Sequence, residues 1–544
     1  MAEHMSLPGV EWDPDASFSF DELYRFPGNL DEFDVHRGRK RVAVLGGGIA
    51  GLVAAVELLK RGHEAEVFEA SERPGGRILT QRFSDGSHGE LGAMRIPANH
   101  HCTLHYVRDL ALKTRRFVNN NEAGYFYFRG RRTRLNAWNH VADLFNLKLE
   151  ERRDPLALYE GVMNRGMVFL SSADKWSMFT DQLTDGRLRD YEEANLFQYL
   201  NRWLSPEAIS YIGHATGMLQ YERAAFLETM IDYFGLFRVD QFELEDGMEA
   251  LPRALADSLG GAVHYNARVT GISLRGEGSD GRVVIGLSAG GESCEKEFDY
   301  AICTLPAPVL PRVRFDPVPA HQQCAAWRGV SYASASKTLV HCDSRPWEYD
   351  DGIFGGGSFT DTLIQQVWYP SDNAAEIDSG NLLVGFTGDD ADSPTRGFAT
   401  APRSYAAKDP AFSRGPGVLT GAYMWERNSE RFAALDDDQR TELVLRGLRP
   451  LHPTLEKSVV EIVHHCWGQQ ISPGSGAFAY FGPGEHERYQ PWLGEPYPSS
   501  KHPRVFFAGE HLAIAHAWIQ GAIQTALAAV CEVLRSPTSA GGAT

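Results

Sequence analysis

The stretch that decides the fold runs Arg41-Val-Ala-Val-Leu-Gly-Gly-Gly-Ile-Ala-Gly51 and continues as an apolar run to Leu59. Residues 41–45 predict a buried strand, the three glycines predict a turn, and residues 49–61 predict a helix that ends at Gly62. Residues 64–70, Glu-Ala-Glu-Val-Phe-Glu-Ala, predict a second strand. Two short apolar strands joined by a helix are typical of a parallel sheet that is buried on both faces.

The glycines of the turn have the spacing of a dinucleotide site. Gly46 permits the tight turn, Gly48 lets a diphosphate approach the backbone, and Gly51 lets the helix pack on the sheet. The diphosphate then lies at the helix N-terminus, where unpaired N–H groups and the helix dipole favour anions. Glu69, at the end of the second strand, is placed to accept hydrogen bonds from a ribose. The turn, the helix start and the strand end therefore predict these cofactor contacts: Gly46, Gly48, Ile49, Ala50, Gly51, Glu69 and Ala70.

The residues after Glu69 favour FAD over NAD. The run Ser71-Glu-Arg-Pro-Gly-Gly-Arg77 places two arginines and a pair of glycines just past the ribose-binding strand. Arginine forks suit diphosphate oxygens, and glycines let the backbone run close to a flat ring. We therefore expect Arg73, Gly75, Gly76 and Arg77 to contact the cofactor.

At this point the chain resembles the flavin amine oxidase family, and within it the L-amino-acid oxidases. The stretch Glu69-x-x-x-Arg73-x-Gly-Gly-Arg77 matches the family's second FAD motif, and Phe507-Ala-Gly-Glu-His511 is similar to its third. The resemblance spans about residues 41–534 and implies FAD as the cofactor. Family members with covalent flavin carry a cysteine shortly before the C-terminal helix. None lies between Cys466 and Cys531, so we expect FAD to be held non-covalently.

The same resemblance implies further cofactor contacts along the chain. Val269 is placed to contact adenine, and Thr304-Leu-Pro306 resembles the strand end beside the cofactor. The remaining positions implied are Gly92, Ala93, Met94, Arg95, Trp467, Gly509, Glu510, Trp518 and Ile519.

The fold class expected is α/β, with a Rossmann-like FAD-binding domain of the glutathione-reductase type. A mixed-sheet substrate domain and a helical insertion interrupt it. A chain of 544 residues is long enough for two or three such domains. The predicted boundaries are an N-terminal arm at 1–38; a discontinuous FAD-binding domain at 39–100, 247–320 and 455–535; a largely helical domain at 101–246; a substrate-binding sheet domain at 321–454; and a disordered tail at 536–544.

Composition excludes several classes of partner. The net charge of −18 argues against nucleic acid or an anionic membrane surface. The seven cysteines are scattered and never spaced C-x-x-C, so we expect neither disulfides nor a metal site. The N-terminus has no basic start followed by an apolar run, and glycines interrupt the apolar residues 42–59. We therefore expect a cytoplasmic protein without a membrane span. A homodimer is expected as well.

A further arginine, Arg95, narrows the class of substrate. Glu90-Leu-Gly-Ala-Met-Arg95-Ile-Pro97 is similar to the segment of L-amino-acid oxidases whose arginine binds the substrate carboxylate. A guanidinium matches a carboxylate in a two-bond fork. The alternative is that Arg95 pairs with a structural acid. By the same resemblance, Tyr369 donates to the carboxylate and the Ala517 carbonyl accepts from the substrate amine.

Lys337 resembles the family lysine that holds a water against the flavin. A lysine inside an apolar strand is uncommon unless something offsets its desolvation. We expect it to position water or to assist the reaction with oxygen, and the alternative is an exposed lysine at a sheet edge. The catalytic residues predicted are thus Lys337, Arg95 and Tyr369.

The side-chain pocket is predicted from aromatic residues. Phe478, Tyr480 and Trp518 would favour aromatic or large apolar amino acids. Some L-amino-acid oxidases have a histidine in the segment that here reads Phe226-Leu-Glu-Thr-Met-Ile-Asp232, and this chain has none there. Either Glu228 or Asp232 lines the substrate channel, or both are solvated helix charges, which is the favoured alternative.

The predicted reaction is oxidation of a free L-amino acid by oxygen, giving a 2-oxo acid, ammonia and hydrogen peroxide. The alternatives are an amide-forming L-amino-acid 2-monooxygenase, an amine oxidase of the same family and, more distantly, a flavin-binding protein without turnover.

Overall fold

The computed structural model describes residues 18–35, 38–180, 183–236, 239–276, 281–377, 404–468, 476–513 and 515–537. Most of the predicted tail and the first part of the predicted arm lie outside these residues. The described part of the arm, from residue 18, lies over the body. There Gln520 and Gln524 donate to the backbone carbonyls of Tyr24 and Leu23, each at 2.9 Å.

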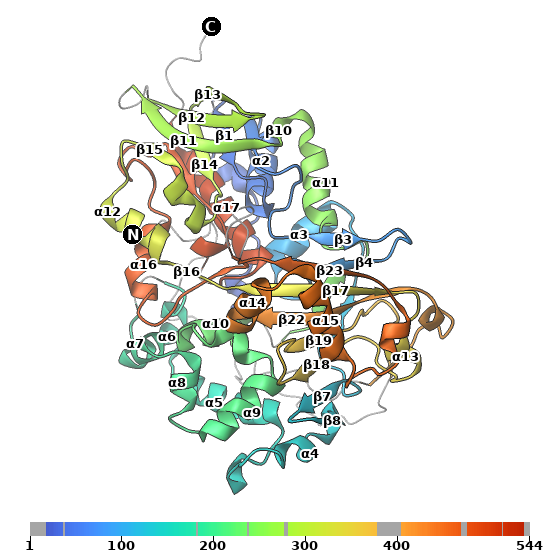
Figure 1. The fold of residues 1–544 in the computed structure, drawn as a ribbon. Helices are drawn as coiled ribbons and strands as arrows, with labels where there is room; N and C mark the ends of the chain where they lie inside the picture. The colour runs from blue at the N-terminus through green and yellow to red at the C-terminus, as the bar shows by residue number, and fades with distance from the viewer. Residues whose placement is uncertain are drawn as a thin grey trace.

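The predicted strand–helix–strand unit forms the centre of a five-stranded sheet whose strands are all parallel. Helix α2 (Ile49–Lys60) follows strand β1 (Arg41–Leu45). Helix α17 (Ile519–Arg535) packs against α2 in the same apolar cluster. Figure 1 shows these blue and red segments, from opposite ends of the chain, in one part of the molecule. In spatial order the strands are β10 (Val263–His264), β2 (Glu64–Phe68), β1 (Arg41–Leu45), β14 (Tyr300–Cys303) and β25 (Val505–Phe507).

A second sheet packs beside the first and supplies the end of the molecule at the top of Figure 1. Its order is β13 (Glu292–Phe298), β12 (Arg282–Ala289), β11 (Ala267–Arg275) and β15 (Arg314–Asp316). The mixture of a parallel α/β unit with further sheets confirms the predicted fold class.

The largest described sheet has seven strands and crosses the predicted domain boundaries. It takes β23 from the segment predicted to belong to the FAD-binding domain, because β23 pairs antiparallel with β17. It also takes β7 and β8 from the segment predicted to be largely helical, because β7 pairs with β18. In order the strands are β23 (Val459–Cys466), β17 (Ala335–Cys342), β22 (Gly417–Trp425), β19 (Gln366–Trp368), β18 (Gly357–Thr360), β7 (Tyr125–Phe128) and β8 (Arg131–Arg134).

Helices cover the lower part of the molecule in Figure 1, in the colours of residues 139–236. Their apolar faces pack into one large core cluster with residues of the seven-stranded sheet. They are α4 (Asn139–Ala142), α5 (Pro155–Met167), α6 (Ser172–Ser177), α7 (Gly186–Glu193), α8 (Leu196–Leu200), α9 (Pro206–Ala215) and α10 (Phe226–Leu236).

Shorter elements connect these layers. The other helices are α1 (Phe20–Leu23), α3 (His101–Asp109), α11 (Ala250–Leu259), α12 (His321–Gly329), α13 (Pro346–Tyr349), α14 (Glu426–Ala433), α15 (Asp437–Leu448) and α16 (His486–Leu493). The small sheets are β3 (Thr80–Arg82) with β4 (His88–Glu90), β5 (Ile96–Pro97) with β9 (Gln241–Leu244) and β6 (Thr114–Phe117), β16 (Ser331–Tyr332) with β24 (Ala479–Tyr480), and β20 (Ala374–Glu376) with β21 (Tyr405–Ala407).

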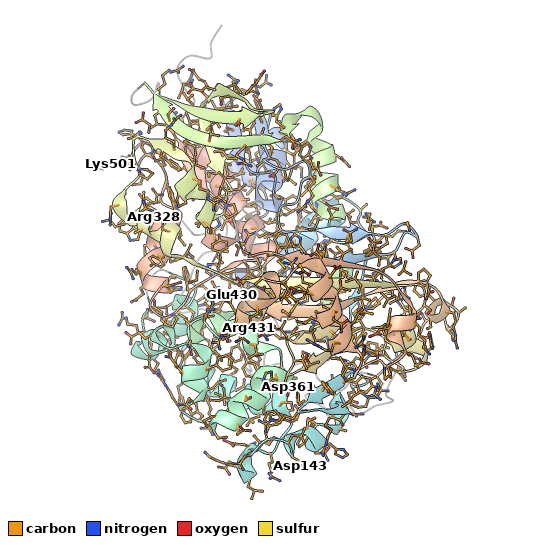
Figure 2. All side chains as sticks on the ribbon, viewed as in Figure 1. Asp143, Arg328, Asp361, Glu430, Arg431 and Lys501 are labelled. Carbon is orange, nitrogen blue, oxygen red and sulfur yellow. The ribbon has the colours of Figure 1, made fainter. Side chains whose placement is uncertain are left out.

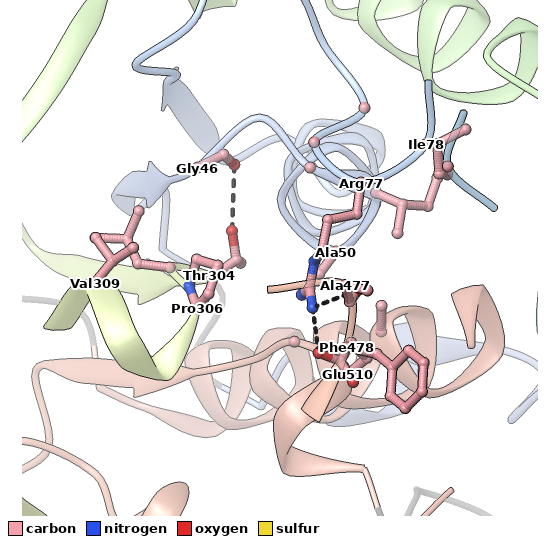
Figure 3. Close-up of a pocket in the computed structure, with 18 of the residues that line it drawn as sticks. Gly46, Ala50, Arg77, Ile78, Thr304, Pro306, Val309, Ala477, Phe478 and Glu510 are labelled. Carbon is pink, nitrogen blue, oxygen red and sulfur yellow. Dashed lines mark hydrogen bonds and ion pairs between the residues drawn. The ribbon is translucent and has the colours of Figure 1, made fainter. Parts of the chain in front are cut away.

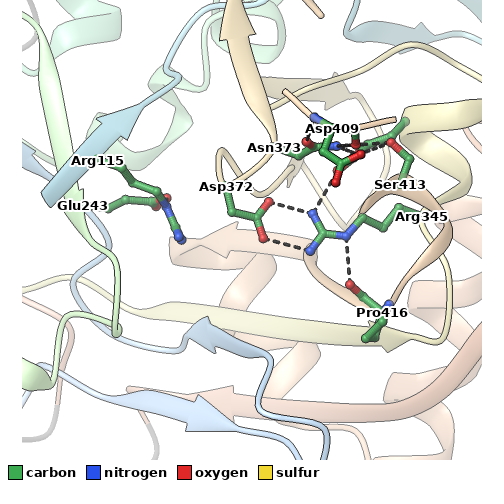
Figure 4. A network of polar contacts seen from close by, with 9 residues as sticks. Arg115, Glu243, Arg345, Asp372, Asn373, Asp409, Ser413 and Pro416 are labelled. Atoms are coloured by element: carbon green, nitrogen blue, oxygen red, sulfur yellow. Dashed lines mark hydrogen bonds and ion pairs between the residues drawn. The ribbon is translucent and has the colours of Figure 1, made fainter. Parts of the chain in front are cut away.

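A buried ion-pair network fixes one corner of the seven-stranded sheet (Figure 4). Arg345 is 3% exposed and donates to both carboxylate oxygens of Asp372, at 2.6 and 2.8 Å. It also donates to the Pro416 carbonyl at 2.8 Å. Such a two-bond fork offsets the cost of burying both charges.

Charged side chains cover the outside of the molecule; Lys501 and Glu430 are examples in Figure 2. Among the described helices, none is both long and apolar enough to cross a membrane.

Candidate active site

A cavity of about 500 Å³ lies where the parallel sheet meets the seven-stranded sheet. Its walls come from the carboxyl ends of β1, β2 and β14, from β17 and β22, and from the start of α17. The carboxyl ends of parallel strands are where open α/β sheets bind nucleotides. Figure 3 shows Gly46 and Thr304 on one side of this cavity, and Arg77 with Glu510 on the other.

Local geometry explains why glycine stands at positions 46, 48 and 51. Gly46 has φ +109°, and a Cβ on Gly51 would lie 2.0 Å from the Gly46 carbonyl oxygen. Gly48 lines the cavity, and a Cβ there would meet nothing within 4 Å. Gly48 is also the N-cap of α2 and makes no side-chain capping bond. The backbone thus leaves an open approach to a helix N-terminus, which fits a diphosphate.

Glu69 and Val269 line the far end of the same cavity. Glu69 accepts from the Gly47 N–H at 2.7 Å and from the Ser71 N–H at 2.8 Å, so its carboxylate is fixed in place. The Ser71 hydroxyl also donates to Oε1, at 2.7 Å, so Oε1 has two donors and Oε2 has one. Each carboxylate oxygen has two acceptor sites, so Oε2 can still accept from a ribose hydroxyl. Ala70 lies beside Glu69 in the lining.

The two arginines after β2 have different surroundings. Arg77 lines the cavity and forms an ion pair with Glu510. Arg73 is absent from the lining residues and donates to the carbonyls of Gly76 and Ile78, at 2.7 and 3.0 Å. The turn after Arg73 leaves carbonyl oxygens without helix or strand partners, and the guanidinium binds them. The predicted contact of Arg73 with the diphosphate is therefore not supported; it braces the turn.

Glu510 connects three segments of the site. It accepts from the backbone N–H groups of Ala479, at 3.1 Å, and Ala517, at 3.0 Å. Burial pushes the pKa of Glu510 upward, but Arg77, with His516, His511 and the Ala517 N–H, holds it below its usual value. Glu510 is therefore an anion that ties the segment before α17 to this cavity. Because the sequence predicts FAD here, we call it the FAD cavity.

Most other predicted cofactor residues lie at this cavity. Trp467 donates from Nε1 to the Leu91 carbonyl at 2.8 Å and lines the wall. Besides Arg73, three predicted cofactor residues, Gly51, Met94 and Arg95, are absent from the lining, and Arg95 lines a second cavity instead. The predicted residues in the lining are Gly46, Gly48, Ile49, Ala50, Glu69, Ala70, Gly75, Gly76, Arg77, Gly92, Ala93, Val269, Trp467, Gly509, Glu510, Trp518 and Ile519.

Lys337 is buried inside β17, between β22 and β23, and is 2% exposed. The alternative of an exposed sheet-edge lysine is therefore wrong. Its Nζ donates to the carbonyls of Gly92 at 2.7 Å and Glu90 at 3.2 Å, and lies 4.6 Å from the centre of the Tyr423 ring. Burial lowers the pKa of Lys337, because the charged form loses its hydration.

Arg95 lines a second cavity of about 440 Å³, between the helical region and β18 and β19. Its Nη1 donates to Asn119 at 2.7 Å, and its guanidinium lies 5.5 Å from the Trp368 ring centre. Burial lowers the pKa of Arg95, and nearby Tyr423, Tyr221 and Asp232 oppose this effect. The alternative of a structural acid near Arg95 thus has a candidate in Asp232. Met94, the residue before Arg95, lies with its sulfur 3.4 Å from Lys337 Nζ, and Ala93 and Lys337 line the FAD cavity. The second cavity, which we call the vestibule, therefore adjoins the FAD cavity.

Tyr369 is not at either cavity. Its hydroxyl is hydrogen-bonded to Ser358 and His452, both at 2.7 Å, within a separate apolar cluster. Successive residues of an extended chain point to opposite faces, and Trp368 takes the vestibule face. The predicted contact of Tyr369 with the carboxylate is therefore not supported. Tyr423, on β22, lies near Arg95 and lines the FAD cavity, and the sequence analysis missed it.

Of the three aromatic residues predicted to form the side-chain pocket, two line the FAD cavity and one does not. Phe478 and Trp518 line the FAD cavity, as does Trp425, which the sequence analysis missed. Tyr480 is absent from the lining and pairs with Ser331 in the β16–β24 sheet. Tyr423 and Trp425 are two residues apart on β22 and therefore face the same side of the strand. Any strand that packs on a core shows this spacing, so the sequence did not reveal that these residues face a cavity.

Neither acid of α10 is a solvated surface charge, because Glu228 is buried and Asp232 is half-buried. Glu228 is 6% exposed and bonds His516 Nδ1 at 2.8 Å. Asp232 accepts from Trp518 Nε1 at 2.7 Å and from the Tyr221 hydroxyl. Burial raises the pKa of Asp232 to about 6. The favoured alternative of solvated helix charges is therefore wrong, and neither acid lines the described cavities.

Comparisons with known proteins agree with this geometry. A family model described as flavin containing amine oxidoreductase matches residues 49–534. The L-amino-acid oxidase of Crotalus adamanteus is 28% identical over 516 residues, covering 92% of this chain and 88% of that protein. The L-amino-acid oxidase of Vipera ammodytes ammodytes is 28% identical over 511 residues, covering 91% and 93%.

Solved structures show the same fold. A putrescine oxidase triple mutant superposes with a TM-score of 0.69 at 20% identity, covering 92% of this chain and 99% of that chain. The wild-type enzyme bound to putrescine gives 0.67 at 19% identity, covering 92% and 100%. The chain therefore belongs to the flavin containing amine oxidoreductase family and is a flavin-dependent oxidoreductase with FAD as its cofactor.

Proposed function

We propose that the chain is an L-amino-acid oxidase. It converts a free L-amino acid, oxygen and water into a 2-oxo acid, ammonia and hydrogen peroxide. The observation that carries the proposal is the half-buried guanidinium of Arg95 in a vestibule that adjoins the FAD cavity. A simple amine has no anionic group to pair with this guanidinium. An amino acid has a carboxylate, and the ion pair that it forms would offset the desolvation of the guanidinium.

Arg95 and Tyr423 are the groups proposed to bind the carboxylate. Each charge-assisted hydrogen bond contributes about 1.5–3 kcal/mol, and the planar guanidinium fixes the orientation of the carboxylate. The Tyr423 hydroxyl replaces the one that the sequence analysis assigned to Tyr369.

The amine and the side chain would lie against the opposite wall. Ala517 lines the FAD cavity, and we assign its backbone carbonyl to the substrate amine. Phe478, Trp425 and Trp518 supply aromatic surface on the same cavity, which favours an aromatic or large apolar side chain.

Lys337 completes the site as a proton-holding group. A lysine with a lowered pKa releases its proton more readily, and the neutral amine keeps one lone pair after donating to Glu90 and Gly92. That lone pair can accept from a water molecule in the cavity. When bound, FAD supplies the two-electron acceptor and passes the electrons on to oxygen. FAD would be held non-covalently by the β1–α2 turn, Glu69 and Arg77.

Anaerobic mixing with a panel of L-amino acids tests the proposal, with flavin bleaching as the readout. Phenylalanine should bleach the flavin, and phenethylamine, which lacks the carboxylate, should do so at least about 100-fold more slowly. Equal rates would establish an amine oxidase. Mass spectrometry of the aerobic products should show the 2-oxo acid and peroxide; a shortened amide with carbon dioxide would establish a monooxygenase. The homodimer and the cytoplasmic location stay predictions.

A further inference from the structure

Three carboxylates hold three consecutive residues just before α17, which we call the 516–518 segment. Glu228 bonds the His516 ring at 2.8 Å. Glu510 accepts from the Ala517 backbone N–H at 3.0 Å. Asp232 accepts from the Trp518 indole N–H at 2.7 Å. Each of these contacts is buried or partly buried, so water competes weakly for the acceptors.

The middle residue of this segment has a strained backbone. Ala517 has φ +71°, in the left-handed region that residues with a Cβ rarely adopt. Such a conformation persists only where surrounding contacts over-determine it, and it concentrates at functional sites. Ala517 and Trp518 both line the FAD cavity, so any change in this backbone moves the cavity wall.

Two of the three carboxylates come from a single helix. Glu228 and Asp232 are four residues apart on α10 and therefore lie on the same face, one turn apart. They bond the residues on either side of Ala517. A rigid helix with two acceptors at this spacing can hold the two flanking side chains at a fixed separation, which sets the backbone between them.

Both carboxylates of α10 are occupied by these contacts. Asp232 bonds Trp518 through Oδ1 and Tyr221 through Oδ2. Glu228 bonds His516 through Oε1. Neither acid lines the FAD cavity or the vestibule. A direct contact with the substrate would therefore require these side chains to move towards a cavity.

We propose that Glu228 and Asp232 are positioning residues, which clamp the 516–518 segment and so hold Ala517 and Trp518 in place for the substrate. The proposal rests on the proposed function only in that the substrate amine contacts Ala517. It assigns α10 a role in the geometry of the site, in place of a role in proton transfer or side-chain recognition.

The test compares an acceptor-retaining and an acceptor-removing substitution at Asp232. Asp232→Asn keeps an oxygen that can accept from Trp518, so its kcat/KM should stay within about threefold of wild type. Asp232→Leu removes the acceptor and should lower kcat/KM by about 10- to 100-fold, with most of the loss in kcat. Tyr221→Phe is the matched control, because it removes the other partner of Asp232 and leaves the Trp518 bond; it should resemble Asp232→Asn.

A second substitution separates clamping from general damage. Glycine adopts positive φ about as readily as negative φ, so Ala517→Gly no longer needs the clamp for its backbone. Ala517→Gly combined with Asp232→Leu should therefore recover at least about threefold in kcat over Asp232→Leu alone. A merely structural role for Asp232 would give no such rescue.

Crystal structures of the FAD-bound variants without substrate give a readout that does not depend on activity. Residue 517 should leave the left-handed region in Asp232→Leu and keep it in Asp232→Asn. The proposal is overturned if φ stays positive in Asp232→Leu, or if Asp232→Asn loses as much activity as Asp232→Leu. Failure of wild type to oxidise any L-amino acid would instead refute the proposed function, and the crystal structures would still decide the clamp. If Asp232→Leu does not fold, Trp518→Phe, which removes the donor, takes its place with the same expected shift in φ.

Discussion

The FAD cavity and the substrate vestibule are built in different ways. The cavity is shaped largely by backbone: Gly46 and Gly48 form the turn, and Gly51 lets the helix pack against it. The vestibule and its neighbouring wall are shaped by charged side chains, above all the half-buried Arg95 and the buried Lys337. The first is therefore sensitive to a single methyl group, and the second to charge and hydrogen bonding.

The largest effect is expected from Gly51→Ala. The added Cβ would lie 2.0 Å from the Gly46 carbonyl oxygen, which only backbone movement can relieve. We expect loss of FAD binding, seen as purification of a colourless protein. Gly48→Ala is the matched control for folding, because its Cβ meets nothing within 4 Å of protein. It should fold and bind FAD weakly, since the methyl group would enter the space for the diphosphate. A yellow Gly51→Ala protein would contradict the backbone argument.

A smaller effect is expected from the pH dependence of stability. Burial lowers the pKa of Lys337 below its usual 10.5, so between the two values the unfolded chain binds a proton that the native chain does not. Native stability should therefore rise with pH in this window, by up to about 1.4 kcal/mol per pH unit from this one group. Lys337→Met removes this contribution.

Calorimetry at about pH 8 and about pH 10 measures the contribution of Lys337 to the pH dependence of stability. The change in Tm with pH should be more positive for wild type than for Lys337→Met. Parallel changes in the two proteins would show that Lys337 is charged in the native state.

The smallest effect is expected from the tyrosines. Tyr423→Phe removes one hydroxyl from the proposed carboxylate site and should raise KM by about tenfold, or about 1.4 kcal/mol. Tyr369→Phe removes a hydroxyl that bonds Ser358 and His452 away from both cavities, and should leave KM unchanged. The reverse ranking in steady-state kinetics would restore the assignment to Tyr369.

The contrast between the two regions also explains what the sequence could predict. The β1–α2 turn and Glu69 lie within 30 residues of one another, so local spacing determined their geometry. Arg73 lies in the same stretch, but the orientation of its side chain depends on carbonyl groups left unpaired by the following turn. Residue spacing alone does not predict that orientation.

The substrate side depends on pairing between distant strands. Whether Tyr369 or Tyr423 faces the cavity follows from the alternation of β19 and β22 within the seven-stranded sheet, and that sheet joins segments from residue 125 to residue 466. The burial of Glu228 and the partial burial of Asp232 likewise follow from α10 packing against the 516–518 segment. A helix read alone presents these acids as ordinary surface charges.

The most direct test of the central claim is the preference for phenylalanine over phenethylamine in wild type and in Arg95→Leu. Wild type should prefer the amino acid strongly, and Arg95→Leu should lower kcat/KM for phenylalanine by about 10²- to 10⁴-fold while changing that for phenethylamine little. The preference should therefore nearly disappear. A preference that survives the loss of Arg95 would contradict the assignment of this guanidinium to the substrate carboxylate.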